Sequence, residues 1–127
     1  MAVVIGAFGA HWLRGEVPRW YSDAQMQERM LDNWETGVRY QMYSALGMVA
    51  AGLWASQRRG RQVRFVSYAF LAGTLLFSGL LYLLVLTGQT TLGKVVPVGG
   101  FAMIVGWSLL AWQVWQDHAA KELKEYS

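Results

Sequence analysis

The chain contains no cysteine, only two prolines and few charged residues. Without cysteine it can form no disulfide, no thiolate nucleophile and no cysteine-ligated metal site. Charged residues make up 15% of the 127 positions, against about 25% in an average soluble domain. The length is that of one domain, and the small net charge of +3 gives no basis for expecting a nucleic-acid partner.

The longest stretch without any charge lies between Arg64 and Lys94. It contains the apolar run 65–87, and about 20 apolar residues are enough for a helix to cross a bilayer. A polar break at 88–91 separates this run from a second one at 92–116. The pattern predicts a transmembrane hairpin, because a soluble domain this small could not cover two helices that are apolar on every side.

Two further spans are predicted in the first half, a short one at residues 1–14 and another at 37–55. Residues 22–36 carry an apolar stripe with charges on the other faces, which indicates an amphipathic helix at the membrane interface that runs into the second span. Ser22, with glutamine three residues later, has the capping-box pattern for its start. Pro18 is expected to end the helix before it.

These elements predict an all-α fold, an integral membrane four-helix bundle with the amphipathic helix between its first two spans. Residues 1–127 form a single membrane domain. Four arginines without any acid occupy the loop after the second span, and by the positive-inside rule this basic loop faces the cytoplasm. We therefore expect a bacterial inner (plasma) membrane protein with both termini in the cytoplasm. The arginines are Arg58, Arg59, Arg61 and Arg64.

This orientation brings scattered polar side chains to one level near the outer surface. Polar groups at membrane depth need partners and often mark a functional site. The alternative is that they bond to one another and fix the bundle, with Arg39 extending to the headgroups. The residues of this outer polar pocket are His11, Arg39, Tyr40, Gln41, Ser44, Ser78 and Tyr82.

No set of residues in the sequence has the pattern of a catalytic or metal site. His11 and His118 are predicted on opposite sides of the membrane, so they could not ligate one haem. The predicted spans contain no Asp or Glu, which counts against a proton-coupled efflux pump. We expect no catalytic residues, no metal, no cofactor and no enzymatic activity.

Small residues recur at spacings that let helices approach closely. The residues predicted to serve helix packing are Gly6, Ala10, Gly73, Gly79, Gly99, Gly100 and Gly106.

Several of these motifs are familiar as a set. In order, they are G-A-F-G-A-H at 6–11, E-T-G-V-R-Y-Q-M-Y at 35–43, F-S-G at 77–79 and P-x-G-G at 97–100. Their order and spacing resemble the small membrane proteins of domain of unknown function 423, whose eukaryotic relatives are called transmembrane protein 256. The resemblance implies four transmembrane helices and no assigned chemistry. Members commonly have His where this chain has Ser44, so a histidine pair would be incomplete here.

Two functional hypotheses remain. The first is a non-catalytic structural or accessory subunit that acts by helix–helix association, with itself or with other membrane protein subunits in the lipid bilayer. The alternative is a binder or conduit for a lipid, a quinone or another small amphipathic ligand at the outer polar pocket.

Overall fold

The structure is a computed structural model that describes residues 1–56 and 63–125. In this part of the chain every regular element is a helix. Three members of the predicted basic loop, Arg58, Arg59 and Arg61, lie outside the described residues.

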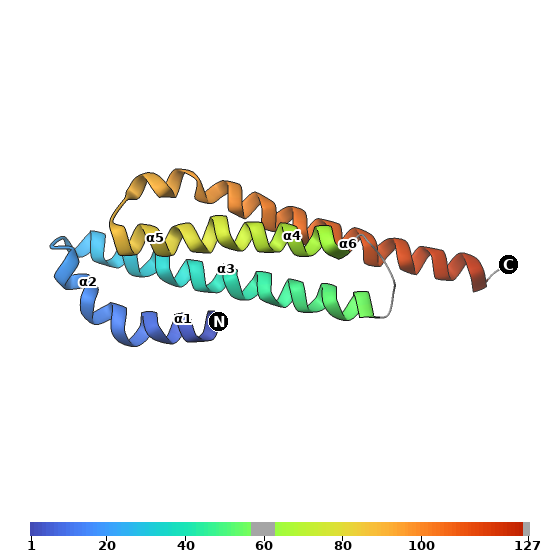
Figure 1. Cartoon of the computed structure of the whole chain (residues 1–127), viewed down its shortest axis with the longest axis horizontal. Coiled ribbons are helices and arrows are strands. Elements are labelled where there is room, and N and C mark those ends of the chain that lie inside the picture. The colour runs from blue at the N-terminus through green and yellow to red at the C-terminus, as the bar shows by residue number, and fades with distance from the viewer. Residues whose placement is uncertain (57–62, 126–127) are drawn as a thin grey trace.

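The helices form four rods that lie side by side (Figure 1). The second rod, α3, packs against the first and third rods, and the fourth rod packs mainly against the third. One end of the bundle holds the chain reversals near Tyr21 and Gly88, and we call it the Tyr21–Gly88 end. The first rod consists of α1 Ala2–Phe8, η1 Gly9–Leu13 and α2 Arg14–Trp20, and the second is α3 Ala24–Ser56. The third rod consists of α4 Val63–Thr74, η2 Leu75–Gly79 and α5 Leu80–Thr87, and the fourth of η3 Thr90–Lys94 and α6 Val96–Glu125.

Proline does not end the first rod where the sequence predicted. The helix continues through Pro18 to Trp20 and ends where Tyr21 becomes extended, at φ −127° and ψ 121°. Because Pro18 lies in the last turn, its missing N–H costs only one backbone hydrogen bond. The prediction that Pro18 stops the helix was therefore wrong by two residues.

The cap of the second rod lies one residue later than predicted. The Met26 backbone N–H donates to Asp23 Oδ2 at 2.9 Å, so Asp23 rather than Ser22 satisfies the first turn of α3. Residues 24–36 do not form a separate helix, because they are the first part of the 33-residue α3. Their apolar stripe is turned inward, where Met30 and Trp34 are buried.

Two apolar clusters form the core. One, towards the Tyr21–Gly88 end, joins the first three rods and is made of Leu13, Val17, Met30, Trp34, Leu84 and Val85. The other, towards the opposite end, joins α3, α4 and α6 and is made of Ala51, Val66, Phe70 and Leu110. Both clusters depend on residues from at least three rods, so the rods form one body.

Two segments of the described chain are long and apolar enough to cross a membrane, Arg64–Thr87 and Thr90–Glu122. They correspond to the predicted third and fourth spans. The first rod and α3 do not meet the same criterion of length and hydropathy. Their passage through the membrane stays a prediction.

Candidate functional site

Two adjoining hollows separate α3 from the first half of the fourth rod. The hollow at the Tyr21–Gly88 end has a volume of about 640 Å³. The second hollow, which we call the deeper hollow, lies farther from that end and has a volume of about 460 Å³. Phe77 and Pro97 line both, so we treat the hollows as one α3–α6 groove. The first is also lined by Arg29, Met30, Asn33, Thr36, Leu81, Leu84, Thr90, Gly93, Lys94 and Val96, and the second by Tyr40, Tyr43, Ser44, Gly100, Phe101, Met103, Ile104 and Trp107.

The groove exists because the fourth rod packs closely against the third rod and much less against α3. At Gly99 a Cβ atom would lie 2.4 Å from the backbone nitrogen of Phe77, a separation that only glycine permits. A Cβ atom at Gly73 would lie 3.0 Å from the carbonyl oxygen of Gly99. This close contact leaves α3 and α6 apart, with the Phe77 ring between them.

The chemistry of the lining changes along the groove. Arg29 and Lys94 are exposed at the Tyr21–Gly88 end. Hydroxyl and amide side chains follow, and the deeper hollow is lined by aromatic and aliphatic residues with one serine. No carboxylate lines either hollow. The groove can therefore accommodate a molecule with a polar head and an apolar body.

The structure joins two residues of the predicted polar pocket directly. The Tyr82 hydroxyl donates to Gln41 Oε1 at 2.9 Å, between α5 and α3. The Tyr82 ring lies 4.6 Å from the Trp34 ring, and a Cβ at Gly37 would approach it to 2.7 Å. The Tyr82–Gln41 pair thus joins two helices of the bundle, as expected if the polar residues bond to one another and fix the helices.

Two predicted hydroxyls are buried without partners. Ser44 is 0% exposed and Ser78 is 1% exposed. Neither hydroxyl oxygen makes a hydrogen bond to any described residue. Ser44 lines the groove, and Ser78 follows Phe77 in the π-helical turn η2. A third predicted residue, Tyr40, packs its ring 4.6 Å from Phe77 and also lines the groove.

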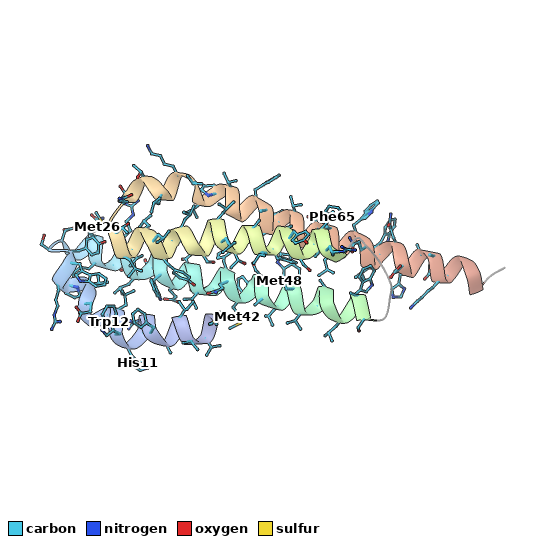
Figure 2. The ribbon with its side chains drawn as sticks, viewed as in Figure 1. His11, Trp12, Met26, Met42, Met48 and Phe65 are labelled. Atoms are coloured by element: carbon cyan, nitrogen blue, oxygen red, sulfur yellow. The ribbon has the colours of Figure 1, made fainter. Side chains whose placement is uncertain are left out.

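The remaining predicted pocket residues lie elsewhere. His11 is exposed on η1 and points away from the other helices (Figure 2). Arg39 forms an exposed ion pair with Glu35 at 2.9 Å. The structure thus brings neither residue to Tyr82 or to the groove.

Comparisons with known proteins agree with the motifs. A family model described as "Protein of unknown function (DUF423)" matches residues 5–100. The chain belongs to the DUF423 family. It is 39% identical over 111 residues to "UPF0382 membrane protein YwdK" of Bacillus subtilis (strain 168), covering 87% of this chain and 83% of that protein. It is 36% identical over 110 residues to "UPF0382 membrane protein SH2409" of Staphylococcus haemolyticus (strain JCSC1435), covering 87% and 82%.

The family resemblance drawn from the sequence is therefore confirmed, and this DUF423 chain is a membrane protein of unassigned function. No solved structure matches it. The names of these relatives describe them as membrane proteins and mention no ligand or reaction.

Most of the glycines predicted for helix packing in this DUF423 protein meet its own helices. Gly6 faces Val38, Gly106 faces Phe70 and Gly100 faces Phe77, while Gly73 and Gly99 form the contact described above. Gly79 faces open space, and Ala10 lines a separate hollow between α1 and α3.

The hollow between α1 and α3 has a volume of about 570 Å³ and, unlike the α3–α6 groove, has mainly acids among its charged lining residues. Arg14 lines it together with Glu28, Asp32 and Glu35. No group of three His, Asp or Glu side chains in the described ranges could hold a metal ion. The hollow between α1 and α3 and the α3–α6 groove thus differ in charge, because Glu28, Asp32 and Glu35 of α3 line only the former.

Sequence reasoning missed the contacts that attach the first rod. Trp34 Nε1 donates to the Ile5 carbonyl oxygen at 3.1 Å, and a Cβ at Gly9 would lie 2.4 Å from the Trp34 ring. The Tyr21 hydroxyl donates to the Val85 carbonyl oxygen at 2.9 Å. The pairing of Gly9 with an indole has no local signal, because these residues lie 25 positions apart in the sequence.

Proposed function

We propose that this DUF423 membrane protein acts by binding rather than by catalysis, and that the α3–α6 groove holds a small amphipathic ligand such as a lipid or a quinone. The observation that carries the proposal is the change along the groove from cations to apolar rings.

The proposal includes four membrane-spanning rods with the basic loop, Arg58 to Arg64, in the cytoplasm. The Tyr21–Gly88 end then faces the outside of the cell. The groove opens on the sides of two helices that are apolar enough to span, so a ligand would enter it from the lipid.

The test uses two tryptophan variants on α6. Ile104 and Val98 are both well exposed, at 63% and 57%, but only Ile104 lines the groove. In protein purified in mild detergent, native mass spectrometry should show bound lipid or quinone for the wild type and for Val98→Trp. Ile104→Trp should lose it, and equal retention by all three proteins would contradict ligand binding in the groove.

A second candidate function is association as an accessory subunit or homo-oligomer. The observation that favours it is the far part of α6, which runs beyond the other rods (Figure 1). Trp112 and Trp115 are exposed in the second half of α6, with ring centroids 5.4 Å apart. The glycine contacts support association less than the sequence suggested, because most of them are used within the chain.

This second candidate predicts that Trp112→Ala with Trp115→Ala reduces the mass of the complex extracted from native membranes. Light scattering after chromatography in mild detergent measures that mass. The same mass for the wild type and the double variant, equal to one chain in its micelle, would exclude association through this surface.

A further inference from the structure

We infer that the ligand of the α3–α6 groove is an anionic phospholipid, whose phosphate lies between Arg29 and Lys94 and whose acyl chain lies over Phe77 and along α6. The inference rests on the proposed ligand-binding function and names the class of ligand. Three properties of the groove carry it: the charges at its mouth, the polar groups below them, and its length.

The two cations at the mouth form no ion pair within the described part of the chain. The ion pairs within the described ranges are Arg19–Glu16 and Arg39–Glu35, and neither involves Arg29 or Lys94. Arg29 also borders a second hollow lined by the acids Asp23, Glu28 and Asp32, but it forms no ion pair with any of them. Because the groove itself contains two cations and no carboxylate, it favours an anion at this position.

Polar groups continue below the charges at the depth of lipid ester groups. Asn33 and Thr36 follow Arg29 by four and seven residues on α3, which places them roughly 6–10 Å deeper. Both line the groove, and neither side chain hydrogen-bonds to another described residue. Their free amide and hydroxyl donors suit the carbonyl oxygens of a glycerol ester.

The length of the groove matches one leaflet. Lys94, which carries the charge at the mouth, and Trp107, the last lining residue of the fourth rod, lie thirteen positions apart. At helical rise this corresponds to about 20 Å, close to half of a bilayer that is roughly 40–45 Å thick with its headgroups. Lys94 also lies at the start of the segment Thr90–Glu122, where the headgroup layer is expected.

The deeper hollow of the groove is lined by apolar and aromatic side chains that suit an acyl chain. Phe101, Ile104 and Trp107 recur on α6 at every third residue and form one wall, and Tyr40 and Tyr43 stand opposite on α3. Phe77 forms the floor between them. A flexible acyl chain can lie along these residues, and each buried methylene contributes to binding.

The test compares two lipids that differ only in the headgroup. Dioleoylphosphatidylglycerol or dioleoylphosphatidylcholine is added to the delipidated, detergent-purified protein, and native mass spectrometry counts the lipid that remains bound. The wild type should prefer the anionic lipid. Arg29→Gln and Lys94→Gln should each weaken its binding about fivefold, and the double variant should bind both lipids equally.

Arg14→Gln is the matched control, because it removes the same charge at the same end of the bundle but from the hollow between α1 and α3. It should leave the preference intact. Circular dichroism and a single chromatographic peak establish that each variant is folded.

The outcomes separate the two proposals. Equal binding of both lipids by the wild type, with loss in Ile104→Trp, overturns the anionic lipid and leaves the amphipathic ligand. Binding that is insensitive to Ile104→Trp overturns both. Glycerol 3-phosphate that binds as tightly as the lipid also overturns the inference, because the apolar part of the groove would then contribute nothing.

Discussion

At the scale of single residues, glycine determines where the helices meet. A Cβ at Gly99 would approach backbone atoms of Leu76 and Phe77, which cannot move without shifting η2. Gly99→Ala should therefore lower the free energy of unfolding by about 1–3 kcal/mol. Gly52→Ala, where nothing lies within 4 Å, should raise it by about 0.5–1 kcal/mol through better helix propensity. Unfolding in mixed detergent micelles, followed by circular dichroism, measures both, and equal effects would contradict the close contact.

A second prediction at this scale concerns the hydrogen bond between Tyr82 and Gln41. Tyr82→Phe should cost about 0.6 kcal/mol of stability, the average for hydrogen bonds between helices in membranes. Tyr40→Phe is the control, since the Tyr40 hydroxyl has no bond within the described chain, and it should change stability little. A double-mutant cycle with Gln41→Leu should recover the same 0.6 kcal/mol as coupling; zero coupling would show that the bond adds nothing.

At the scale of elements, the first rod is attached to α3 through Trp34. Trp34→Phe replaces the indole with a smaller aromatic ring and removes the hydrogen bond to Ile5. Amides of residues 2–13 should exchange hydrogen about fivefold faster in this variant, as expected for the loss of about 1 kcal/mol. Trp12→Phe, on a partly exposed ring, is the control and should leave exchange unchanged. Mass spectrometry of peptic fragments gives the rates.

The start of α3 supplies a matched pair of substitutions. Asp23→Ala removes the acceptor of the Met26 N–H and should destabilise α3 by about 1 kcal/mol. Ser22→Ala should have almost no effect, because the Ser22 side chain makes no hydrogen bond in the described structure. Hydrogen exchange at the first turn of α3 and the unfolding midpoint report both variants. A larger loss of stability for Ser22→Ala than for Asp23→Ala would show that Ser22 is the cap, as the sequence predicted.

This cap shows why element boundaries were harder to predict than the elements. Ser22 and Asp23 both suit a helix start, and only the observed backbone decides between them. The apolar run 65–87 needed no such choice, since it carries no charge. The π-helical turns η1 and η2 have no clear local signal, because each accommodates a tertiary contact. The groove was only partly predictable: polar residues suggested a pocket, but no local pattern brings Phe77, Pro97 and Ile104 together, because their meeting depends on how three helices pack.

At the scale of the whole molecule, the absence of cysteine makes the proposed orientation directly testable. Gln89→Cys lies in the turn at the Tyr21–Gly88 end, and Ser56→Cys lies at the end of α3. If the basic loop is cytoplasmic, a membrane-impermeant maleimide added to intact cells should label Gln89→Cys and spare Ser56→Cys until the cells are lysed. The reverse pattern would invert the topology, and labelling of both positions in intact cells would exclude a membrane crossing by the third rod.

The unbroken course of α3 has a consequence for how deeply the protein sits. Its 33 residues extend about 50 Å, more than the roughly 30 Å of hydrocarbon. If α3 spans the membrane as proposed, its charges from Glu28 to Asp32 resist immersion, so the headgroup boundary stays near that part of the bundle. Membranes of different thickness must then adapt at the opposite face, around Trp54 and Trp112, by tilting the bundle or by thinning the lipid there.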